Sequence, residues 1–141
     1  MATKIREIMT GSPTSVSPEL DLVTVARAMR DEDIGAVLVA DGDDLLGLVT
    51  DRDLVVRGLA AGGDPSQIRI GAIASTAPAT IGPDDSLDKA AQIMRERAVR
   101  RLPVLEDGRP VGIVSLGDLA MKRDGDGVSA LADISAARPN T

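Results

Sequence analysis

The chain has 141 residues, a net charge of −6, and no Cys, His or aromatic residue. This composition excludes disulfides, thiol nucleophiles and zinc sites built on Cys or His, and it removes the usual general base near neutral pH. The acidic balance argues against nucleic-acid binding, and the longest apolar run, about residues 34–40, is too short to cross a membrane. We therefore expect a cytoplasmic protein that contacts neither nucleic acid nor membrane.

The chain contains an internal repeat. Residues 5–57 and 70–122 align at a constant offset of 65 residues without a gap, and 13 of the 53 paired positions are identical. Two halves of about fifty residues would each be marginal alone, so we expect them to pack about a pseudo-two-fold axis. We place repeat 1, with an N-terminal segment, at residues 1–63, repeat 2 at 64–123 and a tail at 124–141.

Both repeats predict the same series of elements, an α/β (α+β) fold of two β-α-β-β-α repeats. Apolar residues recur at i, i+3, i+4 and i+7 from Leu22 and from Leu87. This spacing predicts amphipathic helices with Asp21 and Ser86 as N-caps. The other predicted elements are short helical turns (5–9, 70–74), brief extended segments (14–16, 79–81), paired strands (36–40 with 45–50, 102–105 with 110–115) and second helices from Asp51 and Leu116.

Two further segments lie outside this pattern. Residues 58–67 (GLAAGGDPSQ) form a Gly/Pro/Ser-containing linker between the repeats. Residues 124–128 resemble the start of an EF-hand loop but lack its third oxygen ligand and closing Glu, so we interpret them as a flexible, solvated break. We expect residues 128–137 to form a short terminal helix packed on the body.

The strand-to-helix junctions carry the most chemical information. Each has a Gly–apolar–Val segment followed by a hydroxyl, Thr50 or Ser115, and three residues later by a carboxylate, Asp53 or Asp118. A helix start can hold a phosphate, and a carboxylate beside it can accept hydrogen bonds from ribose hydroxyls. The same spacing is close to a capping box, in which the hydroxyl and the acid satisfy the helix end and bind nothing. Both interpretations stay open.

Catalysis finds no support in the sequence. Asp51 and Asp53 form an acidic pair, but acids in the first turn of a helix usually stabilise the positive end of the helix dipole. No His, Cys or Lys lies nearby in the sequence to complete a catalytic mechanism. Neither a dinucleotide-binding glycine motif nor a phosphate-binding loop occurs. We expect a protein that is not an enzyme, with no catalytic residue, no metal site and no obligatory cofactor.

In combination, these segments resemble the CBS domain, named after cystathionine β-synthase, and the chain resembles a small stand-alone bacterial protein with a tandem CBS pair. The resemblance covers about residues 3–123. It rests on residues 5–10 (IREIMT), the helix from Leu22, residues 33–36 (DIGA), residues 100–104 (RRLPV), residues 50–62, and the Gly–apolar–Val–Thr/Ser–x–x–Asp segment of both halves.

The resemblance implies a regulatory module with two clefts between the repeats, commonly occupied by AMP, ADP, ATP or a similar adenosine compound as a regulatory ligand. Asp53 and Asp118 would hold ribose hydroxyls, and Thr50 and Ser115 would contact ribose or phosphate. Backbone and aliphatic groups would flank the base, and charge-assisted donors would meet phosphate. The residues so implied are Thr14, Val16, Ala79 and Ile81 for the base, and Arg100 and Arg101, with Pro103 beside them, for phosphate. The alternative is that Arg100 and Arg101 form a solvated basic pair that contacts no ligand.

Charge separates the two halves. Residues 1–65 have a net charge of −6 and residues 66–123 a net charge of +2. An anionic ligand would therefore favour the second half, and we expect Asp118 to matter more than Asp53. The alternative is a structural or interaction module with degenerate clefts that binds no nucleotide.

We expect no effector domain beside the two repeats, so that any output would pass through a separate protein or a change of assembly. We predict a homodimer because several apolar residues remain after the core face of each helix is assigned. These residues are Val23, Val55, Val56, Leu59, Ile93 and Met121.

Overall fold

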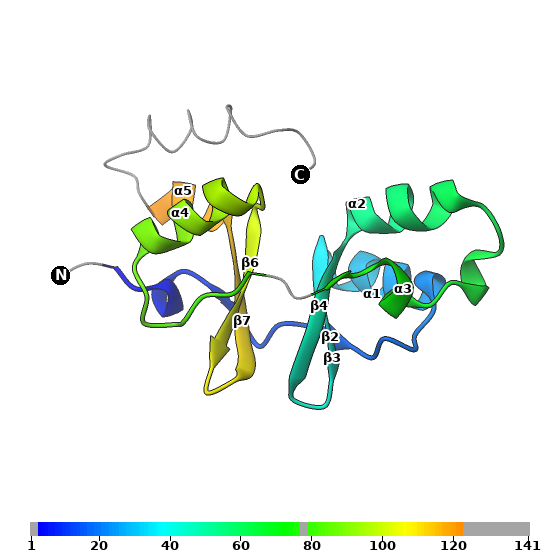
Figure 1. Cartoon of the computed structure of the whole chain (residues 1–141), viewed down its shortest axis with the longest axis horizontal. Helices are drawn as coiled ribbons and strands as arrows, with labels where there is room; N and C mark the ends of the chain where they lie inside the picture. The colour runs from blue at the N-terminus through cyan, green and yellow to red at the C-terminus, as the bar shows by residue number, and fades with distance from the viewer. Residues whose placement is uncertain (1–2, 77–78, 123–141) are drawn as a thin grey trace. The chain divides into compact units, whose positions relative to one another are not determined.

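The computed structural model describes residues 3–76 and 79–122, which belong to two compact units (Figure 1). The central unit is Pro13–Pro78, and the terminal unit combines Met1–Ser12 with Ala79–Thr141. Each unit holds a β-sheet and helices, so the predicted fold class is confirmed. Within the described ranges, no helix has the length and apolar character needed to cross a membrane.

The central unit is built on a four-stranded sheet in the order β2-β3-β4-β5. Strand β2 (Ser15–Val16) runs parallel to β3 (Ala36–Asp41), whereas β3 pairs antiparallel with β4 (Asp44–Thr50), and β4 with β5 (Ser75–Thr76). Helix α1 (Leu22–Glu32) joins β2 to β3. The β3–β4 turn needs a left-handed residue, supplied by Gly42 at φ 61°.

Short helical segments follow β4. Helix α2 (Asp51–Asp53) continues into a π-helical turn, η2 (Leu54–Gly58), and a 3₁₀ turn, η3 (Leu59–Ala61). The predicted linker is thus partly helical, and it also contains η4 (Pro65–Gln67). Helix α3 (Ile70–Ile73) then leads into β5.

The terminal unit repeats this plan with a three-stranded sheet in the order β1-β7-β6. Strand β7 (Arg109–Ser115) pairs antiparallel with both β6 (Arg101–Glu106) and β1 (Thr10–Gly11). Ile81 forms a parallel bridge with Val104, which is equivalent to the β2–β3 pairing of Val16 with Val39 in the central unit. The helices are η1 (Ile5–Glu7), α4 (Leu87–Arg97) and α5 (Leu116–Lys122), and α4 contacts α5 (Figure 1).

The compact units differ from the sequence repeats at their boundaries, which we predicted at residues 1–63 and 64–123. The opening segment of each repeat completes the other repeat's unit: β1 pairs with β7, and β5 pairs with β4. The registers are equivalent at the offset of 65, because Thr10 lies opposite Ile113 and Ser75 lies opposite Leu48. Ile5 and Ile70, one in each opening segment, are fully buried.

Each unit has its own aliphatic core. The central core includes Leu22, Val25 and Met29 from α1, and the terminal core includes Leu87, Ala91 and Met94 from α4. These are the positions that the helical spacing predicted. The predicted caps are also confirmed: the Asp21 carboxylate accepts from Thr24 N at 3.0 Å, and Ser86 Oγ accepts from Lys89 N at 3.1 Å. The predicted terminal helix at residues 128–137 lies outside the described residues.

Candidate functional site

The central unit forms a complete capping box at the start of α2. The Thr50 backbone N–H donates to Asp53 Oδ2 at 2.9 Å, and the Asp53 N–H donates to Thr50 Oγ1 at 3.2 Å. Asp53 is only 9% exposed. The junction therefore satisfies two amides that the helix start leaves without a helical partner.

The terminal unit forms the same box at the start of α5. The Ser115 N–H donates to Asp118 Oδ2 at 2.8 Å, and the Asp118 N–H donates to Ser115 Oγ at 3.1 Å. Asp118 is half-buried. The capping interpretation of the motif is thus correct for both units. In each box the carboxylate accepts through Oδ2. An ionised carboxylate has two acceptor oxygens, so the box leaves Oδ1 for a further hydrogen bond.

Three segments of the central unit meet at the box. The Asp51 N–H donates to the Gly35 carbonyl at 3.0 Å, and Ala36 lies opposite Thr50 in the β3–β4 ladder. The Thr14 carbonyl accepts from Leu38 N at 2.9 Å, so the residue preceding β2 lies at the same end of the sheet. The structure therefore brings Thr14 to the sheet end that carries Thr50 and Asp53.

The terminal unit gathers equivalent segments around Ser115. Arg101 lies opposite Ser115 in the β6–β7 ladder, and the Arg100 carbonyl accepts from Leu116 N at 2.8 Å. Ile81 is tied to β6 by both its backbone groups: its N–H donates to the Pro103 carbonyl at 3.1 Å, and its carbonyl accepts from Leu105 N at 2.9 Å. Arg100 and Arg101 are half-buried at the beginning of the hairpin.

Three of the residues implied for ligand contact are buried. Val16 is 9% exposed, Ile81 is 4% exposed, and Pro103 is fully buried. Val16 packs in the central core and Ile81 in the terminal core. In the two base-flanking segments, half-buried Thr14 and Ala79 present more surface.

Two acidic residues missing from the site predicted from the sequence lie beside the central box. Glu32 Oε1 accepts from Thr14 Oγ1 at 2.5 Å, and Asp33 closes α1 in a left-handed conformation with φ 54°. At the offset of 65, these positions are Arg97 and Ala98 in the terminal unit. A comparison of charge at paired positions, in addition to identity, would have found them.

Neither unit shows a metal centre in its described residues. No group of three or more Asp, Glu, His or Cys residues within 3–76 and 79–122 is placed to hold a metal ion. The boxes offer hydrogen-bonding groups. A carboxylate and a hydroxyl at a sheet end can accept and donate to the hydroxyls of a sugar.

Comparison with known proteins identifies the family. The CBS domain model matches residues 5–58 and 70–125. Hypoxic response protein 1 of Mycobacterium tuberculosis is 40% identical over 119 residues, which cover 84% of this chain and 83% of that protein. The crystal structure of hypoxic response protein I with two coordinated zinc ions has a TM-score of 0.76 at 39% identity, with 84% of this chain and 98% of that chain covered.

Two solved structures with bound adenosine compounds share the fold at lower identity. The CBS domain pair of the protein MJ0100, in complex with 5′-methylthioadenosine and S-adenosyl-L-methionine, is 23% identical with a TM-score of 0.78, and 89% of this chain and 99% of that chain are covered. CBSX2 in complex with AMP is 22% identical with a TM-score of 0.71, and 86% of this chain and 96% of that chain are covered. Since the family model matches most of this chain, the chain belongs to the CBS domain family and carries two copies of the domain.

Proposed function

We propose that this protein is a regulatory, ligand-binding CBS pair that senses an adenosine compound such as AMP, ADP or ATP. The observation that carries the proposal is the capping box found at the same sheet end in both units, with Asp53 and Asp118 each bonded through one oxygen only in the box. The second carboxylate oxygen is suited to a ribose hydroxyl. Related CBS proteins that bind AMP or S-adenosyl-L-methionine support the assignment.

The proposed role is binding rather than catalysis. Asp53 and Asp118 are both held by backbone amides, and the sequence has no His or Cys to act as base or nucleophile. We do not extend the zinc sites of hypoxic response protein I to this chain. It lacks the Cys and His ligands that zinc prefers.

A second candidate function is an interaction module that binds no nucleotide. The observation in its favour is that both boxes are closed by reciprocal hydrogen bonds without any ligand. In that case the Thr/Ser and Asp side chains serve only to begin α2 and α5.

The absence of aromatic residues makes the deciding experiment direct. The chain has no Trp, Tyr or Phe, so absorbance near 260 nm after desalting reports co-purified nucleotide with almost no protein background. Calorimetric titration of nucleotide-free protein with AMP, ADP and ATP follows. Heat with any of the three, saturating at a defined stoichiometry, supports the sensor. The absence of a 260 nm peak and of heat with all three supports the interaction module.

We also propose that the protein forms a homodimer. Of the six apolar residues predicted for a second surface, Val55, Val56, Leu59 and Met121 are exposed. Val23 and Ile93 are half-buried, and Ile93 packs against the terminal core, so it is a poorer contact for a partner. Light scattering that gives a mass near 14.6 kDa at micromolar concentration would contradict the dimer.

A further inference from the structure

We propose that the two units prefer adenosine compounds of different charge: the terminal unit takes one that carries a phosphate, and the central unit takes one that carries none. The inference rests on the proposed function, because it assumes that each box contacts a ribose. It adds which class of ligand each unit selects. The observation behind it is a reversal of charge at equivalent positions around the two boxes.

Three acidic residues lie on segments at the sheet end that carries the central box. Glu32 reaches Thr14 at the same sheet end, Asp33 follows at the end of α1, and the Asp51 carboxylate accepts from Arg52 N at 2.8 Å in the first turn after the sheet. All three acids are exposed. Over residues 30–36 and 50–53, five acidic and two basic side chains give a local net charge of −3.

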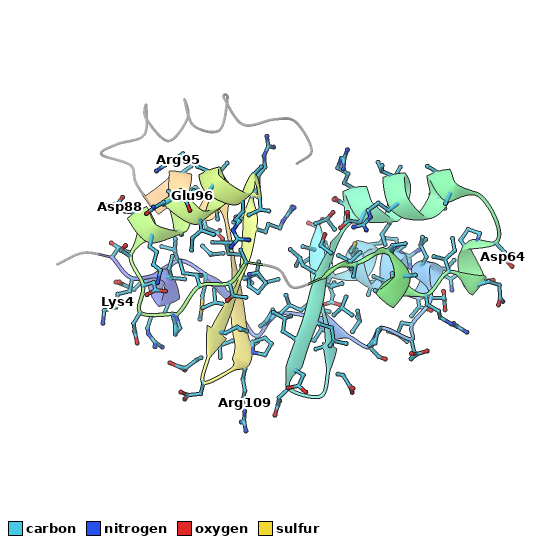
Figure 2. The ribbon with its side chains drawn as sticks, in the orientation of Figure 1. Lys4, Asp64, Asp88, Arg95, Glu96 and Arg109 are labelled. Carbon is cyan, nitrogen blue, oxygen red and sulfur yellow. The ribbon has the colours of Figure 1, made fainter. Side chains whose placement is uncertain are left out.

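The equivalent terminal positions are basic. Arg97 replaces Glu32, Leu116 replaces Asp51, and Arg100 and Arg101 replace Gly35 and Ala36. Over residues 95–101 and 115–118, four basic and two acidic side chains give a local net charge of +2. Figure 2 shows Arg95 and Glu96 on α4, at the end of the sheet opposite the β6–β7 turn that carries Arg109.

A phosphate responds to this reversal more than a sugar or a base does. A phosphate monoester carries almost two negative charges at neutral pH, and it is attracted by Arg97, Arg100 and Arg101 and repelled by Glu32, Asp33 and Asp51. The ribose hydroxyls are neutral and can use the carboxylate of either box. Ribose recognition is therefore common to both units, and the charge of the 5′ substituent separates them.

The test is calorimetric titration of wild type, Asp53→Asn and Asp118→Asn with AMP and with 5′-methylthioadenosine, which has no phosphate. Asn keeps the shape of each capping residue. We expect Asp118→Asn to weaken AMP by about tenfold or more and to leave 5′-methylthioadenosine unchanged, because one charge-assisted hydrogen bond is lost. Asp53→Asn should have the opposite pattern. Loss of both ligands with the same variant, or the reversed pattern, overturns the inference.

Exchange of the charges provides a test that leaves both boxes intact. Glu32→Arg with Asp51→Leu gives the central unit the terminal unit's side chains at these two positions and changes its local net charge from −3 to 0. This variant should raise AMP binding from one to two molecules per chain. Arg97→Glu with Leu116→Asp is the matched exchange and should abolish AMP binding while 5′-methylthioadenosine still binds. Unchanged AMP stoichiometry in both folded variants would overturn the inference.

Salt separates failure of this inference from failure of the proposed function. Arg97 is exposed and Arg100 and Arg101 are only half-buried, so salt can screen these charges. AMP affinity should therefore fall with ionic strength while that of 5′-methylthioadenosine stays constant. If neither compound binds the wild type, and ADP, ATP and S-adenosyl-L-methionine do not bind either, the proposed function itself fails. If both bind with the same salt dependence and the same response to each Asn variant, only the charge preference fails.

Discussion

Gly47 of β4 lies directly against Ser75 of β5. A Cβ atom on Gly47 would stand 2.3 Å from the Ser75 carbonyl oxygen, well inside van der Waals contact. Gly112 of β7 has the equivalent relationship with β1, where a Cβ would be 2.9 Å from the Thr10 carbonyl oxygen and 2.5 Å from Met9 Sδ. The edge strands β5 and β1 thus approach Gly47 and Gly112 so closely that a side chain at either position would collide with the edge strand.

Substitution of these glycines should destabilise the unit that contains each one. We expect Gly47→Ala to lower the free energy of unfolding of the central unit by about 3 kcal/mol, because backbone must move to admit the methyl group. Gly112→Ala should cost the terminal unit less, about 1–2 kcal/mol, since part of its obstruction is the flexible Met9 side chain. Urea unfolding followed by far-UV circular dichroism measures both.

The control is Gly11→Ala in β1. Gly11 is exposed, and a Cβ there would have no atom within 4 Å. Its unfolding midpoint should lie close to that of the wild type. A loss at Gly11 as large as that at Gly47 would show that glycine flexibility, and not the close approach of the edge strand, sets the cost.

The exchange of opening segments predicts a crossed effect of two core substitutions. Ile5 is fully buried in the terminal core although it opens repeat 1, and Ile70 is fully buried in the central core although it opens repeat 2. Ile5→Ala should cost about 2–5 kcal/mol and raise hydrogen exchange in residues 79–122. Ile70→Ala should raise it in residues 13–76. An increase confined to residues 13–58 in Ile5→Ala would contradict the exchange.

Much of the fold is predictable because local patterns agree with it. The apolar spacing from Leu22 and from Leu87 predicts α1 and α4. Asp21 and Ser86 are predictable as N-caps because their side-chain oxygens can accept from the free N–H groups of a helix start. The exchange of segments is not predictable in this way. The alignment shows that residues 5–11 and 70–76 are equivalent, but the same apolar pattern is satisfied whether a segment pairs with its own repeat or with the other.

The capping box was one of the two interpretations that the sequence left open at the strand-to-helix junctions. Thr50 with Asp53 and Ser115 with Asp118 have a spacing that suits both a cap and a ligand site, and the reciprocal hydrogen bonds are visible only in the folded structure. Contacts between segments are also beyond a single sequence. The bond from Thr14 to Glu32 spans 18 positions.

The terminal unit should lose stability in acid partly through Asp84. Arg6 Nε lies 2.9 Å from Asp84 Oδ1 and, by this hydrogen bond and its charge, lowers the pKa of the Asp84 carboxyl. A carboxyl with a lowered folded pKa stabilises the fold above its unfolded pKa, about 4. That contribution is lost as pH falls through the folded value. Asp84→Asn should therefore lower Tm at neutral pH and converge with wild type in stronger acid.

Salt is the control for this electrostatic effect. The pair is exposed, so high salt should narrow the difference in Tm between wild type and Asp84→Asn at neutral pH. A difference that persists unchanged in acid and in high salt would mean that Asp84 acts through packing or through its backbone.

The exposed apolar residues of η2 and η3 should control self-association. Val55 is 57% exposed and Leu59 is 50% exposed. A charge at either position should weaken a dimer that buries it, because an unpaired charge would be desolvated. Sedimentation of Val55→Glu and Leu59→Glu should show a shift toward monomer. Leu46→Glu is the matched control in the same unit: Leu46 is 41% exposed on β4, and its substitution should leave the mass unchanged.

Substitution of the terminal box hydroxyl can separate its capping role from its binding role. Ser115→Ala removes the acceptor for the Asp118 N–H and should cost about 1 kcal/mol of stability, whereas Ser115→Gly should cost only a few tenths. Both remove the hydroxyl. If that hydroxyl contacts a ligand, AMP affinity falls equally in the two variants although their stabilities differ. If the box is only a cap, AMP affinity should change only as far as the free energy of unfolding does. Ser115→Gly should then bind AMP as the wild type does. Urea unfolding and calorimetry on the same three proteins decide between these outcomes.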